Sequence, residues 1–147
     1  MKLYVIRHGN TDSNRLDIYN GKLLNEDINN IGIKQAQEAS KKIKNLNLDL
    51  IICSPLLRTR HTCDIINSNK IKVIYDDRIE ERNCGVLTNT KIDNFYYTEY
   101  WNYYSKVKID NLETVPELFK RVNLFLDEIK KKYRGQNILL VTHGGVA

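Results

Sequence analysis

Apolar and polar residues follow two patterns along this chain, which together predict four strands and three helices. Short apolar runs rich in Ile, Leu and Val lie at residues 2–6, 49–53, 71–75 and 137–141, and such runs are typical of strands. The 49–53 run is apolar at nearly every position. We therefore expect both faces of this strand to be buried in a sheet.

Three segments between these runs carry apolar residues at helical spacing. The first follows Asn29, a good helix cap, and the second covers Pro55 to Asn67, with proline suited to a first helical turn. The apolar positions of the third are Val115, Leu118, Val122, Phe125, Leu126 and Ile129. The predicted order is strand, helix, strand, helix, strand, an irregular segment, helix and strand.

The irregular segment, residues 76–111, is interpreted as a partly helical insertion in a single domain spanning residues 1–147. Its aromatic cluster between residues 95 and 104 suits either a lid or substrate wall, or an aromatic patch packed beneath a loop. Strands and helices alternate outside residues 76–111, and this alternation predicts an α/β fold, a three-layer α/β/α sandwich with a mostly parallel sheet. Functional sites of such folds lie at the carboxyl ends of the strands.

Composition narrows the function classes only partly. A net charge of +5 suits a phosphorylated substrate, nucleic acid or an anionic membrane surface. Lysines gather at 41–44 and 130–132, at the ends of predicted helices, where they complement the helix dipole and face solvent. Because no basic stripe is interleaved with exposed aromatics, we expect no nucleic-acid partner.

Apolar runs and cysteines bear on the compartment. The longest apolar runs, 48–53 and 138–141, are far shorter than the ~20 residues that cross a bilayer. Met1-Lys2 leads directly into a predicted strand, so we expect a cytoplasmic protein without membrane contact. Three widely spaced cysteines form no metal-ligand pattern and predict reduced structural thiols, with no metal site.

The turn after the first predicted strand carries the strongest chemical signal. Arg7-His8-Gly9 is followed by Thr11 and Asn14, which combines a fixed cation, an imidazole, a glycine that permits close approach and two short polar side chains. Neutral imidazole is abundant near pH 7 and can attack phosphorus. A lone histidine after a strand is more often structural, but this context predicts a phosphate pocket.

The chain resembles the histidine phosphatase superfamily, also called the phosphoglycerate mutase-like family. Its RHGxTxxN signature is met by residues 7–14, and Ser54-Pro55-Leu56-Leu57-Arg58-Thr59 matches its SPLxRA-type motif. Residues 79–85 resemble its LxExxxG element, Glu113-Thr114 its ES motif and Thr142-His143-Gly144-Gly145 its THGG element. These motifs occur in family order over nearly the whole chain.

The resemblance implies a cofactor-independent reaction on a phosphorylated small molecule. The implied catalytic residues are His8 as nucleophile, Glu81 as proton donor, and Arg7, Arg58 and His143 around the phosphoryl group. The implied substrate-binding residues are Arg7, Asn14, Asn20, Gly21, Arg58, Glu81, His143 and Gly144. Asp76 and Asp77 are runners-up for the proton donor, and Glu80, Arg60 and His61 are interpreted as bystanders. A homodimer remains open.

The chain departs from the family pattern in five places. Asn20-Gly21 replaces the usual Gln-Gly, Asn25 an acidic residue, and 27–29 a Pro-Leu-Thr helix entry. Residues 86–89 lack the usual aromatic and second glycine. The family has a helix after the THGG element, and because the sequence ends at Ala147 we expect a truncated chain.

Three functions are compatible with this pattern. The leading hypothesis is a phosphomonoester phosphatase in which water attacks phosphohistidine 8. A phosphoglycerate mutase-type phosphotransferase would use the same residues. In the family, mutases that use bisphosphoglycerate carry longer insertions between the general acid and the last motif, so the roughly thirty-residue stretch here favours a phosphatase. The third is an inactive relative that binds a phosphorylated ligand or a protein partner.

Overall fold

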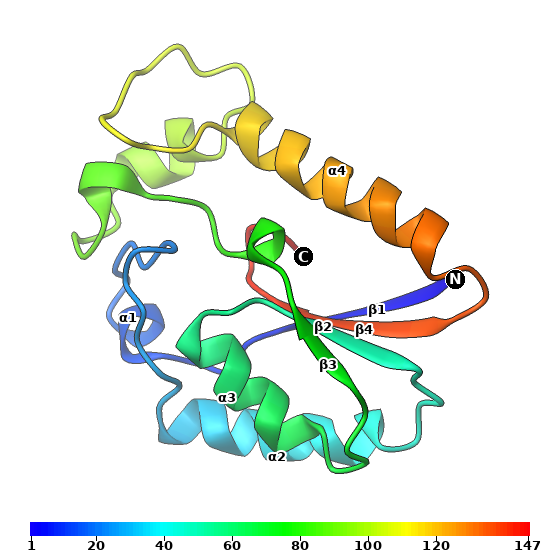
Figure 1. The fold of residues 1–147 in the computed structure, drawn as a ribbon. Coiled ribbons are helices and arrows are strands. Elements are labelled where there is room, and N and C mark those ends of the chain that lie inside the picture. The colour runs from blue at the N-terminus through cyan, green and yellow to red at the C-terminus, as the bar shows by residue number, and fades with distance from the viewer.

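The computed structural model describes all 147 residues, and its centre is a four-stranded, fully parallel sheet. The strands are β1 (Lys2–Arg7), β2 (Leu50–Cys53), β3 (Val73–Tyr75) and β4 (Asn137–Thr142), arranged in the order β1-β4-β2-β3. The helices are α1 (Asp12–Arg15), α2 (Asn30–Ile43), α3 (Leu57–Ile66) and α4 (Val115–Lys132). Figure 1 shows α2 and α3 together on one side of the sheet and α4 on the other.

Two separate cores hold these layers together. On one face, Ala36 and Ile43 of α2 and Cys63 and Ile66 of α3 pack against β2 and β4. On the other, Phe125 and Ile129 of α4 pack against the opposite faces of the same strands. Both central strands are therefore buried on both faces, and the predicted three-layer α/β/α sandwich is confirmed.

Local sequence explains where the long helices begin. The Asn29 side chain accepts hydrogen bonds from the first turn of α2, and Thr114 forms a reciprocal capping box with Glu117 at the start of α4. Helix α3 has no cap of its own, but Asn25 Oδ1 accepts from Leu57 N at 2.7 Å. The lysines at 41–42 and 130–132 lie in the last turns, as predicted.

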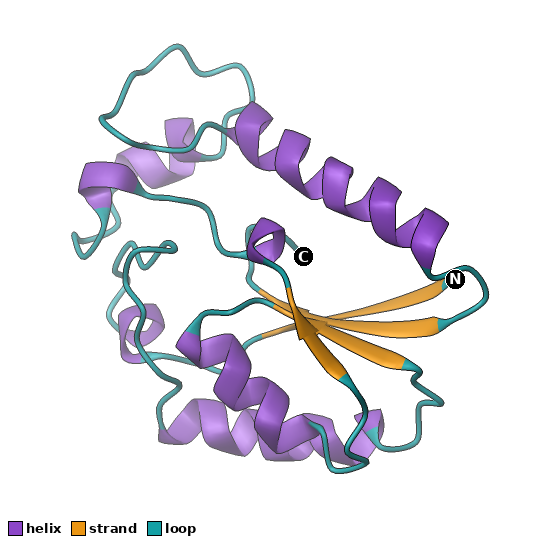
Figure 2. Cartoon of the chain, in the orientation of Figure 1, coloured by secondary structure: helices purple, strands orange, loops and turns teal.

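The segment between β3 and α4 contains only short helical turns, at Asp77–Ile79, Gly85–Leu87 and Tyr96–Tyr100. Figure 2 shows that loops join these turns on the side of the molecule where the β strands end. No helix of the chain combines the length and apolar character needed to cross a membrane.

The register of the sheet brings the two histidines together. Arg7 pairs with Thr142, and Cys53 pairs with Val141, so β1, β4 and β2 end level with one another. His8 N then donates to Thr142 O at 3.0 Å. The residues that follow the strands, His8, Ser54 and His143, consequently lie side by side at one edge.

Candidate active site

His8 is held in one orientation and one tautomer. The side chain is 7% exposed, and Nδ1 lies 2.7 Å from the carbonyl oxygen of Gly9. Because a carbonyl only accepts, Nδ1 carries the proton and Nε2 keeps its lone pair in the neutral ring. Burial, with the nearby charges of Arg58 and Arg7, lowers the pKa of His8 to about 3, against the opposing Gly9 hydrogen bond. His8 is therefore neutral near pH 7.

The turn that carries His8 fits closely against α2. A Cβ on Gly9 would lie 2.5 Å from Gly32 O, and a Cβ on Gly32 would collide with the backbone of Asn10. The amide of Gly9 also donates to Thr62 Oγ1 of α3 at 3.0 Å. Two helices thus fix the backbone next to the imidazole.

Two arginines lie beside His8 in different settings. Arg58 is fully buried, and its terminal nitrogens donate to Leu24 O at 2.9 Å and Gly21 O at 2.8 Å, while Nε has no partner. Burial lowers the pKa of Arg58 to about 10, which leaves the group charged near pH 7. Arg7 is exposed and has no ion pair in the protein. Its guanidinium is free to bind an anion.

His143 is the second buried imidazole. Its ring centroid is 5.1 Å from that of His8, and Nε2 lies 2.8 Å from Ser54 Oγ. Nδ1 is buried without a partner. Burial and the charge of Arg58 hold the pKa of His143 well below its usual range. In the tautomer in which the Ser54 hydroxyl donates to Nε2, the neutral ring presents an N–H at Nδ1.

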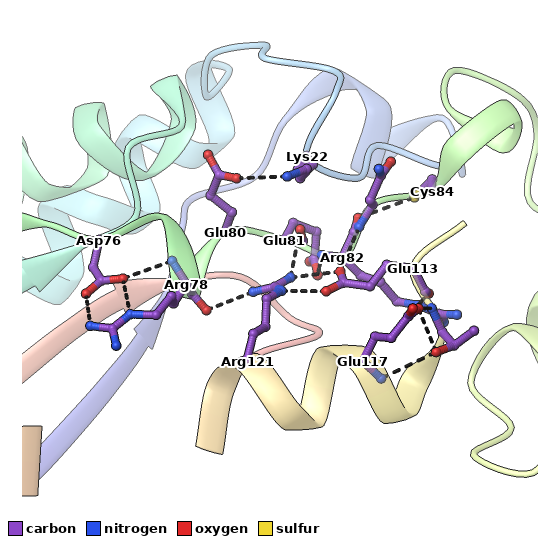
Figure 3. A network of polar contacts seen from close by, with 12 residues as sticks. Lys22, Asp76, Arg78, Glu80, Glu81, Arg82, Cys84, Glu113, Glu117 and Arg121 are labelled. Atoms are coloured by element: carbon purple, nitrogen blue, oxygen red, sulfur yellow. Dashed lines mark hydrogen bonds and ion pairs between the residues drawn. The ribbon is translucent and has the colours of Figure 1, made fainter. Parts of the chain in front are cut away.

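Glu81 reaches the same cavity from the loop after β3. Its carboxylate accepts hydrogen bonds from the amides of Arg82 at 2.8 Å and Gly145 at 3.3 Å. Arg121 of α4 donates to the carbonyl of Glu81 at 3.2 Å and forms a two-point ion pair with Glu113 at 2.5 and 2.9 Å. Figure 3 shows this network, which ties the loop that carries Glu81 to α4.

The segment that follows α1 supplies another wall. Asn14 closes the α1 capping box with Thr11, and Asn20 Nδ2 donates to Thr11 Oγ1 at 3.3 Å and Glu26 Oε1 at 2.6 Å. Gly21 has a φ of +55°, and a Cβ there would lie 2.6 Å from Cys84 Sγ. Only glycine suits this close turn.

These residues surround a cavity of about 90 Å³. Of the residues expected at the site, Arg7, His8, Asn14, Asn20, Gly21, Arg58 and Glu81 line it. His143 is buried next to His8 but does not line the cavity, and Gly144 is exposed next to the Arg7 side chain. Ile18, Tyr19, Cys84, Ile92, Tyr96, Tyr100 and Trp101 complete the lining.

Residues interpreted as bystanders or runners-up bond elsewhere. Asp76 forms a two-point pair with Arg78, Glu80 pairs with Lys22 at 3.6 Å, and His61 bonds to Asp27 at 2.8 Å. The pKa of the Cys84 thiol is raised by burial, so the one cysteine at the cavity is not an activated nucleophile. No group of three or more His, Cys, Asp or Glu side chains is placed to hold a metal ion.

Sequence reasoning missed the buried arginine at 82. Arg82 is 2% exposed, donates to Glu113 O at 2.5 Å and to Tyr100 O, and lies over the rings of Tyr100 and Trp101. Its partners are backbone carbonyls 18 and 31 residues away, so no local pattern could reveal it. The role of Arg121 was also missed, because two of its partners are the carbonyls of Arg78 and Glu81, about forty residues earlier in the chain.

Comparison with known proteins agrees with this geometry. The sequence profile of the histidine phosphatase superfamily (branch 1) matches residues 3–147. Phosphoserine phosphatase 1 of Hydrogenobacter thermophilus is 30% identical over 150 residues, which cover 97% of this chain and 71% of that protein. A protein named probable phosphoglycerate mutase GpmB from Yersinia pestis is 32% identical over 151 residues, with 98% and 70% covered.

Solved structures give the same result. The phosphoserine phosphatase of Entamoeba histolytica, in complex with 3-phosphoglyceric acid, superposes with a TM-score of 0.85 at 25% identity, covering 98% of this chain and 74% of that one. The alpha-ribazole phosphatase of Shigella flexneri gives 0.82 at 28% identity, with 99% and 75% covered. Fold and site thus define an α/β protein with paired histidines at the carboxyl edge of a parallel sheet. The chain belongs to the histidine phosphatase superfamily, branch 1.

Proposed function

We propose that this chain is a phosphomonoester phosphatase that passes a phosphoryl group from a phosphorylated small molecule to His8 and then to water. The observation that carries the proposal is the state of His8. Its proton lies on Nδ1, bonded to Gly9 O, and the depressed pKa keeps the ring neutral. The Nε2 lone pair is therefore available for attack on phosphorus.

Positive and polar groups around His8 suit a transferring phosphoryl group. Charge in its transition state spreads over three equatorial oxygens, so fixed donors supply most of the catalysis. Arg58 Nε and His143 Nδ1 are buried nitrogen atoms without protein partners, and His143 Nδ1 donates in the tautomer in which Nε2 accepts from Ser54. We assign both to phosphoryl oxygens, with Arg7 as the third donor, because a buried donor left unpaired costs about 1–3 kcal/mol.

Glu81 is assigned the proton transfers. As Nε2 of His8 bonds to phosphorus, the ester P–O bond breaks and the leaving oxygen takes a proton from Glu81. In the second step water attacks phosphorus and gives a proton to Glu81, the N–P bond breaks, and inorganic phosphate leaves. The two amide donors to the Glu81 carboxylate fix its direction in both steps.

The test is hydrolysis of 4-nitrophenyl phosphate with a chelator present. We expect the wild type to release phosphate and His8→Ala to lose roughly a thousandfold or more in kcat/KM. Glu80→Gln, at a side chain that pairs with Lys22 outside the cavity, should retain activity. Absence of wild-type activity, or survival of activity in His8→Ala, would refute the proposal. With 3-phosphoglycerate as substrate, a mutase would instead form 2-phosphoglycerate without net phosphate release, and phosphorus NMR distinguishes the two outcomes.

A further inference from the structure

Aromatic side chains flank Glu81 inside the cavity. Tyr100 and Trp101 line it with Glu81, and their rings meet edge to face at 4.9 Å. A Cβ on Gly145 would collide with both Glu81 Oε1 and Trp101 Cη2, so these two side chains flank one point. If Glu81 protonates the leaving oxygen, as the proposed function holds, the leaving group lies against these rings.

The rest of the leaving-group wall is also uncharged. Tyr96 stacks on Tyr100 with ring centroids 5.2 Å apart and an interplanar angle of 20°. Tyr19, Ile18 and Ile92 continue the same wall. The arginines that line the cavity, Arg7 and Arg58, are those assigned to the phosphoryl group.

Other cations near this wall are engaged elsewhere. Arg82 lies over the ring of Tyr100, with its guanidinium carbon 4.2 Å from the ring centroid, and lines a separate cavity. Lys91 Nζ donates to a backbone carbonyl at 2.6 Å, and Lys22 pairs with the carboxylate of Glu80 at 3.6 Å. No lysine lines the cavity or the adjoining groove.

Apart from Arg7 and Arg58, which are assigned to the phosphoryl group, the cavity and the adjoining groove hold acidic rather than basic side chains. Glu81 is inside the cavity, and Asp17 lines the adjoining groove, which shares Arg7, His8 and Tyr96 with it. A carboxylate on the leaving group would lose water against aromatic rings and meet these acids without a cation to pair with. An apolar ring there would gain contact and edge-to-face packing.

We infer that this site selects phosphomonoesters with a small, uncharged leaving group that presents an apolar, planar face, and discriminates against carboxylate-bearing esters. The cavity of about 90 Å³ is well below the ~300–1,000 Å³ of pockets for drug-sized ligands, so a single ring fits best. The inference rests on the proposed function and separates this chain from relatives named for phosphoserine and phosphoglycerate.

Two matched substrate pairs test it. Glycerol 3-phosphate and 3-phosphoglycerate differ in a hydroxymethyl group against a carboxylate. Benzyl phosphate and ethyl phosphate both release an alcohol but differ in the ring. For the wild type we expect kcat/KM to favour glycerol 3-phosphate over 3-phosphoglycerate by roughly 10- to 100-fold, and benzyl over ethyl phosphate by about tenfold.

Four variants test whether this wall causes the selectivity. Trp101→Ala should remove most of the benzyl preference, Trp101→Phe should keep most of it, and Tyr104→Ala, an exposed aromatic outside the cavity, should leave it unchanged. Ile92→Arg places a cation on the wall and should raise the relative kcat/KM for 3-phosphoglycerate about tenfold.

The possible results distinguish failure of the leaving-group selectivity from failure of the phosphatase activity. Equal or preferred turnover of 3-phosphoglycerate or phosphoserine by the wild type would overturn the inference and leave the phosphatase proposal standing. Selectivity that survives Trp101→Ala unchanged, in a folded variant, would overturn the assignment to this wall. No hydrolysis of any of these esters would instead overturn the proposed function.

Discussion

Arg58 and Arg7 both lie at the cavity, yet only Arg58 contributes to the folded structure. Arg58 donates to the carbonyls of Gly21 and Leu24 from a fully buried position and so anchors the segment after α1 onto α3. Arg7 is exposed and forms no ion pair. We therefore expect the Arg7 side chain to bind an anion rather than to stabilise the folded chain.

Substituting each arginine separates these roles. Arg7→Gln should lower kcat/KM by about two to three orders of magnitude while changing the free energy of unfolding by less than ~0.5 kcal/mol. Arg58→Gln should lower both, with about 2–4 kcal/mol lost from stability. Denaturant unfolding and steady-state kinetics provide the measurements. Equal destabilisation by the two variants would contradict the contrast.

The depressed pKa of His8 has a direct pH consequence. The unfolded chain takes up a proton on His8 near pH 6.5, while the folded protein does so only near pH 3. The unfolded state thus binds more protons in this window, and stability should fall as pH decreases through it. NMR titration of the His8 ring should show no midpoint between pH 5 and 8. A midpoint near 6.5 would contradict the burial argument.

Candidate site residues could be predicted from the sequence where one short segment holds several of them. The 7–14 segment combines a strand end, a cation and capping side chains, so its turn was predictable. The buried side-chain nitrogens of Arg58 and His143 that lack a partner were not predictable, because their burial and bonding depend on strands and helices far apart in the chain. The buried Arg82 gave no local signal at all.

At the scale of elements, α2 supports the catalytic turn through a contact between two glycine backbones. Gly32, buried in α2, lies against Gly9 and Asn10. An alanine in a helix is normally more stable than glycine by about 1 kcal/mol. Here the Cβ would meet backbone atoms that cannot move without shifting the turn of His8.

Gly32→Ala should therefore destabilise the protein by about 1–3 kcal/mol, against its helix propensity. Gln37→Ala, an exposed position of the same helix, should be neutral or slightly stabilising. Chemical denaturation of both variants checks the sign. A more stable Gly32→Ala variant would refute the close contact.

Helix α4 supports the proposed general acid through Arg121. Its guanidinium holds Glu113 and donates to the carbonyls of Arg78 and Glu81. Protonation matters most for poor leaving groups, because a good leaving group departs without help. Arg121→Gln should thus lower kcat/KM for ethyl phosphate about tenfold more than for 4-nitrophenyl phosphate.

Arg78→Gln is the matched control for this prediction. Arg78 bonds to Asp76 and to Glu128 of α4 but donates nothing to Glu81. Arg78→Gln should lower kcat/KM for ethyl phosphate and 4-nitrophenyl phosphate equally or not at all. If Arg121→Gln instead lowers kcat/KM equally for ethyl phosphate and 4-nitrophenyl phosphate, the variant disturbs the whole site rather than the position of Glu81.

The regular elements were predictable because each buries a stripe of its own residues. Periodicity located α2, α4 and all four strands within a few residues, although β3 is shorter than the apolar run at 71–75. Residues 76–111 carry no such stripe. Their path depends on side chains such as Arg82 and Arg121 that bond to carbonyls of other segments.

For the whole molecule, strand order decides where the chemistry lies. β4, the last strand in the chain, inserts between β1 and β2, and this places His143 between His8 and Ser54. Alternating strands and helices predicted a parallel sheet, but several strand orders satisfy that pattern. Most of the aromatic wall likewise comes from the short helical turn at Tyr96–Tyr100, which packs with Tyr19 and Cys84 rather than with the two cores of the sheet.

Transfer of phosphate to His8 is the central claim, and trapping the phosphoenzyme tests it most directly. Rapid quenching into base after mixing with radiolabelled phosphomonoester should yield a label that is stable in base and labile in acid. Peptide mapping should locate it on His8, and His8→Ala should carry none. A label on another residue, or hydrolysis by His8→Ala at the wild-type rate, would contradict the account.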